Sequence, residues 1–286
     1  MNNTKTGIVK SFNKEELKVI LKELDYYNYF KCHFLKRKYN NINYGKRIGV
    51  LSFDGLFSAS EQYPYNLEKE KRFSTWHNIL NNKDSSSKEI FCTVLEIFEW
   101  GNVLRGNVND AIKLYNSNKI KHYIAQISFL LNRKEIIDYN SNYKFKKVNN
   151  IEILWSGGWT KVYHFINKDF LIYDSRVSAF LNYTLTKNKK YNSNQLKSLN
   201  NLTQYLFSFE GVSNEKRKRI IEEEKFLFRR KYPSGIEGFN ANLISTWIIH
   251  LLNKELNIKR DMQSYERAFF MLGFDLNQIK SQKSRI

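Results

Sequence analysis

Two residues with complementary chemistry, Lys161 and Asp174, lie close together in this sequence. The lysine follows the turn Ser156-Gly157-Gly158, and the aspartate follows a short apolar run over residues 170–173. A lysine amine can attack an electrophilic carbon and form a Schiff base. A carboxylate can stabilise positive charge that develops at the same centre. The pair therefore predicts covalent chemistry at a carbon that becomes electron-poor.

The glycine turn before Lys161 predicts a helix that starts near Thr160. Backbone N–H groups at a helix N-terminus lack partners within the helix, and a glycine turn lets a phosphate approach them. Ser156, Gly157, Gly158 and Thr160 are therefore candidate contacts to a DNA backbone. The alternative is a simple connector between two helices, with Lys161 as a solvated surface residue.

Asp174 has a structural interpretation beside the chemical one. It stands just before a helix expected over residues 175–181, where an aspartate serves as a good N-cap. That role is compatible with a catalytic one. Arg176, two residues further on, could contact a phosphate or pair with a carboxylate.

The order of these residues resembles the helix-hairpin-helix DNA glycosylases, especially those that act on 8-oxoguanine. In that family a hairpin of the form Leu-Pro-Gly-Val-Gly-Thr-Lys precedes a Val-Asp-x-x-Val segment. Gly157, Thr160 and Lys161 match the hairpin, and Asp174 and Val177 match the second segment. The rest of the chain resembles the family only in its general character.

The match has three departures. Ser156 replaces the usual proline, and Trp159 occupies the place of the second glycine. The interval from Lys161 to Asp174 is also shorter than in the family, so the second helix of the hairpin is expected to be short.

The resemblance implies a mainly α fold of two helical lobes with DNA in the cleft between them. Residues 85–185 would form the hairpin-bearing lobe, and residues 1–84 with 186–286 the second, discontinuous lobe. The implied activity is a DNA glycosylase with AP (β-elimination) lyase activity. Asp174 would be its catalytic carboxylate and Lys161 its Schiff-base nucleophile. The substrate would be double-stranded DNA that contains an oxidised or otherwise modified base, 8-oxoguanine-like, and the enzyme would be a monomer without a cofactor.

Base extrusion requires aromatic and apolar surfaces that hold the flipped base. The chain is 15% aromatic, and Trp100, Trp159 and His164 lie in or near the motif-bearing segments. His164 is three residues after Lys161, which would place the two on one helix face. These three are candidates for the base pocket, although most aromatic side chains are expected in the core.

The charge of the chain favours a polyanionic partner. Its formal net charge is +19, with 47 Lys+Arg against 28 Asp+Glu, and neutralised phosphates release counterions. The segment 187–232 holds 12 Lys/Arg against 5 Asp/Glu. An AT-rich genome also inflates lysine, but it raises glutamate too, and here the acidic residues lag.

Cysteine content excludes several classes of protein. Cys32 and Cys92 are the two cysteines, too few for a disulfide framework or a four-cysteine cluster. Cys32-His33 has no second ligand pair at metal-site spacing, so we expect no metal. No signal core or long apolar span is apparent, which predicts a cytosolic, nucleoid-associated protein.

Apolar spacing and scarce proline and glycine predict long helices and at most a small β contribution early in the chain. Residues 42–75 are less regular and are expected to form loops and short strands. Helices are expected from about residue 15 and over residues 89–100, 108–114, 119–132, 146–154, 239–254 and 261–273.

Two other functions fit the same residues. A helix-hairpin-helix module can bind DNA without catalysis, with the basic segment 187–232 supplying the contacts. An enzyme of the same type could instead excise modified bases from foreign DNA, as in phage defence. The presence of Asp174 favours the enzyme over a protein that only binds DNA, because binding alone does not require a carboxylate near DNA.

Overall fold

The structure is a computed structural model that describes residues 12–64, 67–137, 147–148, 151–186, 190–208, 219, 225–229, 233 and 235–280. It is mainly helical, as the sequence predicts. Much of the basic segment 187–232 lies outside the described residues.

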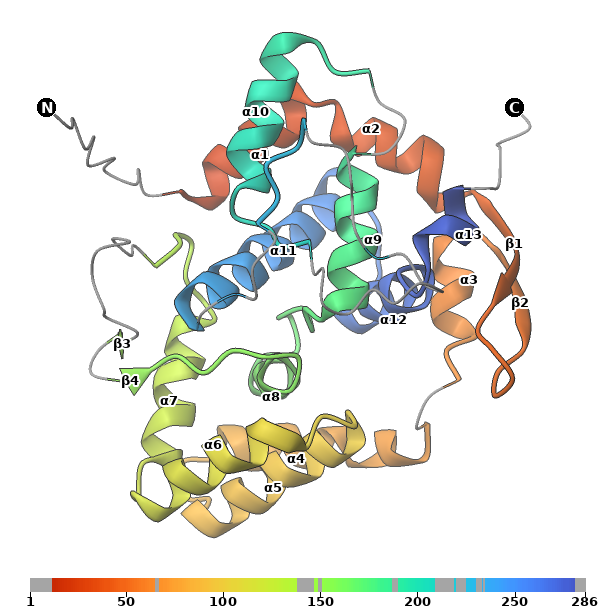
Figure 1. Ribbon diagram of the computed structural model, residues 1–286. Helices are drawn as coiled ribbons and strands as arrows, with labels where there is room; N and C mark the ends of the chain where they lie inside the picture. Colours follow the sequence, from red (N-terminus) through yellow and green to blue (C-terminus); the bar gives the residue numbers. More distant parts are fainter. Residues whose placement is uncertain are drawn as a thin grey trace, which may run out of the picture.

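The helices stack in layers (Figure 1). The lower layer and the helix at its side comprise α4 (Phe73–Asn81), α5 (Ser87–Trp100), α6 (Arg105–Asn116) and α7 (Ile120–Leu130). The middle of the molecule holds α8 (Trp159–Ile166), α9 (Ser175–Thr186), α11 (Gly235–Glu255) and α12 (Met262–Leu272). At the top lie α1 (Lys14–Glu23), α2 (Tyr26–Phe30) and α10 (Ser193–Thr203).

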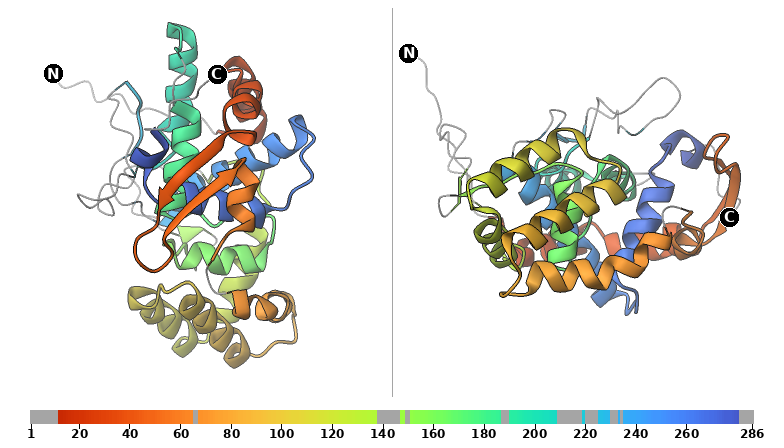
Figure 2. Two further views of the ribbon diagram at one scale, coloured as in Figure 1. Left: turned by 90° about the vertical axis from the view of Figure 1, so that its right-hand side faces the viewer. Right: turned by 90° about the horizontal axis from the view of Figure 1, so that it is seen from below.

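Short elements complete the fold. An antiparallel hairpin of β1 (Lys38–Asn43) and β2 (Val50–Asp54) covers one side, together with α3 (Leu56–Glu61) and α13 (Leu276–Lys280) (Figure 2). The remaining elements are the π-helix η1 (Lys31–Leu35), the 3-10 helix η2 (Leu67–Arg72), and the strands β3 (Lys147–Val148) and β4 (Ile151–Glu152).

Several helices begin at strong local signals. Asn13 accepts hydrogen bonds from the backbone of Glu15 and Glu16, and Glu16 reaches back to the backbone of Asn13. Ser86 and Glu89 form the same reciprocal capping box at the start of α5. These boxes satisfy N–H groups that a helix leaves without partners. The predicted helix starts, at about residue 15 and at residue 89, lie within two residues of the observed ones.

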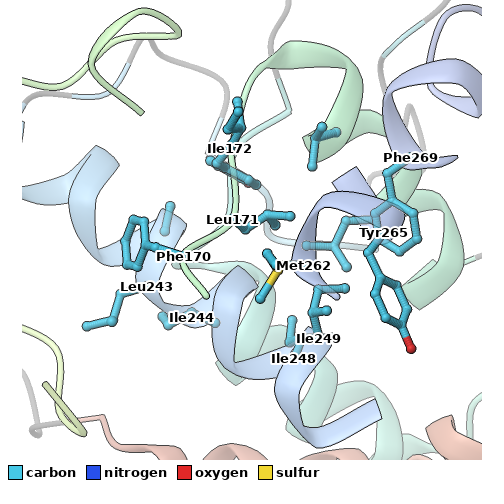
Figure 3. Packing of buried hydrophobic residues seen from close by; sticks show 14 of the residues in the cluster. Phe170, Leu171, Ile172, Leu243, Ile244, Ile248, Ile249, Met262, Tyr265 and Phe269 are labelled. Carbon is cyan, nitrogen blue, oxygen red and sulfur yellow. The ribbon is translucent and has the colours of Figure 1, made fainter. Parts of the chain in front are cut away.

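A continuous core joins the middle layer to its neighbours. The helix α11 is buried over most of its length, with no polar face toward solvent, as expected for a helix that other elements surround. The apolar run Phe170–Ile172 packs against α11 and α12, beside Ile244 and Met262 (Figure 3). The backbone N–H of Leu171 also donates to Thr246 Oγ1 at 3.1 Å. This packing fixes the chain just before Asp174.

The secondary-structure predictions succeed for most long elements. Helices at 89–100, 108–114, 119–132, 239–254 and 261–273 are confirmed by α5, α6, α7, α11 and α12. The irregular stretch 42–75 contains the expected short strands, but also α3, which the sequence analysis missed.

The helix predicted over residues 146–154 is wrong. Lys147 pairs with Glu152, and Val148 with Ile151, in the antiparallel strands β3 and β4. The β-branched residues Val148, Ile151 and Ile153 favour extended backbone, and the apolar spacing alone did not separate the two structures. The predicted division into lobes at residues 85 and 185 stays a prediction.

Within the described residues, no helix is long and apolar enough to cross a membrane.

Candidate active site

The start of α8 is organised by Ser156. Its Oγ accepts hydrogen bonds from the backbone N–H groups of Gly158 and Trp159, each at 3.1 Å, and donates to Asn107 Oδ1 at 2.6 Å. Ser156 therefore caps the helix and ties it to α6. The backbone N–H of Gly158, a predicted phosphate contact, therefore already has a protein acceptor. The same holds for Thr160, whose N–H donates to the Ser156 carbonyl oxygen at 3.0 Å.

Lys161 is a buried lysine, with 8% of its surface exposed. Its Nζ donates to the Gly157 carbonyl oxygen at 2.9 Å, and among the described residues it forms no ion pair with a carboxylate. The aliphatic stem passes over Gly101 at the end of α5, where a Cβ atom would overlap Lys161 Cδ and lie 2.6 Å from its Cε. Gly101 thus leaves the space that the lysine occupies.

Asp174 caps α9. Its Oδ1 accepts from the backbone N–H groups of Arg176 and Val177, at 2.9 and 3.0 Å. No hydrogen bond from a described residue occupies Oδ2, and the residue is half-buried. The N-cap interpretation of Asp174 is therefore confirmed, and one carboxylate oxygen stays available for another contact.

Gly157 brings the two predicted residues to one place. A Cβ atom at Gly157 would lie 3.8 Å from Asp174 Cβ, while the Gly157 carbonyl holds the Lys161 amine. The starts of α8 and α9 therefore adjoin. The shorter interval between Lys161 and Asp174 is spanned by a short α8 and the buried run before Asp174.

A third ionisable residue, Glu266 on α12, belongs to this cluster. It is 6% exposed, and none of the described residues donates a hydrogen bond to its carboxyl group. Burial raises the pKa of Glu266 to about 8, Lys161 acts against that rise, and Asp174 adds to it. Glu266 thus interacts electrostatically with both predicted residues.

Sequence reasoning missed Glu266, although a signal was present. Met262 precedes it by four residues and Phe269 follows it by three, so all three share one helix face. An acidic residue on an otherwise apolar face is unusual. This pattern is a signal in the sequence that could have singled out Glu266.

Two arginines lie at the start of α9. The guanidinium carbon of Arg176 lies 4.1 Å from the ring centroid of Phe270 and 5.0 Å from that of Phe274. Arg219, a buried residue of the basic segment, donates to Ser175 Oγ at 3.1 Å and to the Phe274 carbonyl at 3.3 Å. Both guanidinium groups thus lie near the start of α9 and the end of α12.

Other predicted site residues lie in the interior. Thr160 is fully buried, and its Oγ1 donates to the Gly157 carbonyl at 3.3 Å. A Cβ atom at Gly158, which is also buried, would lie 2.7 Å from Asn107 Cγ. Neither residue offers a side chain to DNA, and only Ser156 and Gly157 of this turn are half-buried.

The three base-pocket candidates pack in the core. Trp159 packs edge-to-face on Phe98 and Tyr123. Trp100 contacts a cluster of aromatic residues, Phe73, Trp76 and Phe165.

His164 Nδ1 lies 2.8 Å from the Phe170 carbonyl oxygen, and burial lowers its pKa to about 4. Each of the three candidates is at most 8% exposed, so the arrangement gives them a packing role.

Two surface hollows lie away from this cluster. One of about 480 Å³ lies between α1 and α10, and its lining includes Phe12, Val19 and Tyr205. Another of about 490 Å³ lies beside His77 and Glu89. Among the described residues, no group of histidine, cysteine and acidic side chains could hold a metal ion.

The starts of α8 and α9 bring together a lysine amine and a half-buried carboxylate, and the buried carboxyl group of Glu266 interacts electrostatically with both. Comparisons with protein-family models, with curated proteins and with solved structures give no match to this chain.

Proposed function

We propose that this protein is a DNA glycosylase with AP lyase activity that excises an oxidised or otherwise modified base from double-stranded DNA. The observation that carries the proposal is the buried residue Lys161, whose amine forms no ion pair with any described residue and adjoins Asp174 at the starts of two helices. Burying a charged lysine away from a carboxylate costs free energy of folding. Such residues are therefore often found at functional sites.

The chemistry of base excision fits these residues. Positive charge builds on the deoxyribose as the base departs, and the Asp174 carboxylate stabilises it. The Lys161 amine attacks the anomeric carbon and becomes linked to the sugar as a Schiff base. Strand cleavage by β-elimination follows from that intermediate.

A modified helix-hairpin-helix is the proposed scaffold. In it α7 and α8 serve as the two helices, because Tyr123 on α7 contacts both Trp159 and Tyr163 on α8. The strands β3 and β4 lie in the connection between them. The hydroxyl of Tyr123 also accepts from the backbone N–H of Leu154 at 3.0 Å, which ties that connection to the helix pair.

The proposed partner is DNA because of the chain's excess of basic residues. Arg176 and Arg219 add positive charge at the start of α9. We propose an 8-oxoguanine-like base as the target, held by a monomeric protein of the cytosol. The biological setting is base-excision repair, with defence against modified phage DNA as the alternative.

A non-enzymatic DNA-binding role is the second candidate. It is favoured by the cap that Ser156 forms on α8 and the cap that Asp174 forms on α9, since each already has a structural use. That role leaves the burial of the Lys161 amine without an explanation.

Borohydride trapping tests the enzymatic proposal. The full-length protein is incubated with duplexes that each carry one modified base, and the reaction is quenched with borohydride, which reduces a Schiff base to a stable adduct. We expect an adduct with at least one duplex, its loss in Lys161→Gln, and its retention in Lys168→Gln, an exposed lysine nearby. DNA binding without any adduct or base release across the panel would favour the binding role.

A further inference from the structure

One face of α11 lies against the two segments that lead into the proposed active site. A Cβ atom at Gly238 would overlap the indole ring of Trp155 and lie 2.6 Å from its Cγ. Further along the helix, Thr246 Oγ1 accepts the hydrogen bond from the Leu171 backbone N–H. Gly238, Asn242 and Thr246 follow one another at intervals of four residues, so Asn242 lies on this face between the other two.

Asn242 is a buried residue whose side chain has no hydrogen-bond partner among the described residues. It is fully buried, and both its amide nitrogen and its amide oxygen lack a partner there. Asn240 shows the ordinary arrangement, because its amide donates to the Ile137 carbonyl oxygen at 2.8 Å and accepts from the Ile137 N–H at 2.9 Å. An amide without partners in the interior costs free energy, so stability does not explain Asn242.

The space beside Asn242 is shaped by Gly238 and filled by Trp155. In an α-helix each Cα–Cβ bond tilts toward the N-terminus, so the side chain of Asn242 leans over Gly238. Because Gly238 has no side chain, the Trp155 indole lies directly on the helix backbone. The ring of Tyr173 is next to it, with centroids 6.4 Å apart. Trp155 thus occupies a slot with glycine at its floor, tyrosine at its side and the Asn242 amide at its end.

Trp155 can leave this slot by rotation of its side chain alone. It is half-buried, whereas the other four tryptophans are each at most 8% exposed. The backbone on both sides is anchored, because the Leu154 N–H donates to the Tyr123 hydroxyl at 3.0 Å and Ser156 caps α8. Movement of the indole therefore requires no movement of the chain.

We propose that the slot which Trp155 fills in the free protein receives the extruded base, and that the Asn242 amide binds the edge of that base. An extruded base is held by hydrogen bonds to its edge and by contact with aromatic side chains. This inference rests on the proposed function. It supplies the base pocket that the buried residues Trp100, Trp159 and His164 do not provide.

The slot adjoins the residues of the proposed chemistry. Trp155 stands two residues before Gly157, whose carbonyl oxygen holds the Lys161 amine. Tyr173 stands directly before Asp174. A base in the slot therefore has its sugar near the starts of α8 and α9, which is where the amine has to reach it.

The shape and the polarity of the slot favour an oxidised purine. Indole and purine are both fused bicyclic rings of similar size, so a purine can take the place of the Trp155 ring. The carboxamide of Asn242 offers a donor and an acceptor side by side. 8-Oxoguanine presents a matching pair, because oxidation adds an N7–H donor between the O6 and O8 acceptors. Guanine has only acceptors on that edge.

The first test follows Trp155 whether or not a base is excised. The full-length protein is labelled with fluorotryptophan, which gives one fluorine NMR signal for each of the five tryptophans. Trp155→Phe identifies the signal of Trp155. We expect this signal to shift when a duplex with one 8-oxoguanine is added, and to shift far less with the same duplex that carries guanine.

The second test separates a contact with the base from a structural role. Asn242→Leu removes an amide that has no described partner, so the urea midpoint should stay the same or rise. Its affinity for the 8-oxoguanine duplex should fall by about tenfold or more, toward that for the guanine duplex. Asn240→Leu is the control. It breaks two hydrogen bonds to Ile137, so it should lower the midpoint yet keep the preference for 8-oxoguanine.

Gly238→Ala tests the slot itself. Its methyl group overlaps the indole, so the Trp155 signal should be shifted already in the free protein, and the 8-oxoguanine duplex should change it no further. Gly106→Ala, where a methyl group meets nothing within 4 Å, should behave like wild type.

A Trp155 signal that responds equally to both duplexes, or to neither, would overturn this inference. So would a lower urea midpoint in Asn242→Leu with an unchanged preference for 8-oxoguanine. If wild type and Asn242→Leu release the base at equal rates, the glycosylase proposal stands and Asn242 has no part in binding the base. If neither releases a base but the Trp155 signal and the preference for 8-oxoguanine behave as described, the pocket stands and the glycosylase proposal falls.

Discussion

At the scale of single residues, one substitution can separate the capping role of Asp174 from its proposed catalytic role. Asp174→Asn keeps the oxygen that accepts from Arg176 and Val177, and asparagine is an equally good N-cap. It removes the negative charge that stabilises the sugar cation in the proposed mechanism. We expect unchanged melting and DNA binding but loss of base excision by about a hundredfold or more. Excision at the wild-type rate in a glycosylase assay would leave Asp174 with capping alone, and Asp169→Asn, an exposed aspartate, is the matched control.

A second prediction at this scale concerns Glu266 and the pH dependence of the free energy of unfolding. Its pKa rises from 4.5 in the unfolded chain to about 8 in the folded protein. The folded state therefore holds a proton that the unfolded state releases, so stability falls as the pH rises from about 4.5 to 8. Each pKa unit is worth about 1.4 kcal/mol.

Substitution by glutamine measures this effect. Glu266→Gln has no proton to lose, so its free energy of unfolding should exceed that of wild type by an amount that grows across this pH range and is constant above it. Urea denaturation at pH 5, 7 and 9 measures the difference. A difference independent of pH would mean that Glu266 titrates normally.

At the scale of elements, the end of α5 positions the amine through Gly101. In Gly101→Ala the new methyl group overlaps the Lys161 side chain, which can move because it is flexible. The backbone at Gly101 is α-helical, with φ −77°, so alanine is tolerated and changes stability by no more than about 1 kcal/mol.

We therefore expect Gly101→Ala to melt like wild type. The rate of borohydride trapping should fall by about a hundredfold, because the displaced Lys161 amine is no longer aligned with the sugar. Gly106→Ala, where a methyl group meets nothing within 4 Å, is the control. An equal fall in the trapping rate of both variants would mean that Gly101 does not position the Lys161 side chain.

The contact between α9 and α12 behaves differently. A methyl group at Gly273 would overlap the backbone carbonyl of Arg176, and it would lie 2.9 Å from the Phe269 carbonyl. Backbone atoms cannot rotate away as the lysine side chain can. Gly273→Ala should therefore destabilise the protein by about 1–3 kcal/mol, seen as a lower urea midpoint. An unchanged midpoint would show that the two helices can separate at little cost.

At the scale of the whole molecule, the charge predicts how DNA binding responds to salt. Contacts of many lysines and arginines with phosphates release counterions, so the affinity should fall steeply between about 50 and 200 mM salt, by about a hundredfold or more. Fluorescence anisotropy with duplexes of different sequence measures this. A DNA affinity that does not change with salt concentration would contradict the proposal that nucleic acid is the partner.

The sequence predicts the mainly helical fold because capping residues and apolar spacing are local signals. It also predicts that Lys161 and Asp174 belong together, and the Gly157 turn brings them close. Glu266 could not be joined to them, because its proximity depends on how α12 packs against α9.

The helix expected over residues 146–154 failed for a related reason. Its apolar residues suit either a helix or a strand pair over so short a stretch. Pairing between β3 and β4 then decides the outcome.

The order in which the chain is made has a consequence for this site. Gly101, Lys161 and Asp174 are synthesised well before Glu266 and Gly273, which lie near the C-terminal end of the sequence. A ribosome adds about 5–20 residues per second, so for some seconds the nascent protein carries the lysine without the carboxyl group on α12. The surroundings of the lysine are then complete only after α12 has been synthesised, so the order of synthesis delays assembly of the cluster.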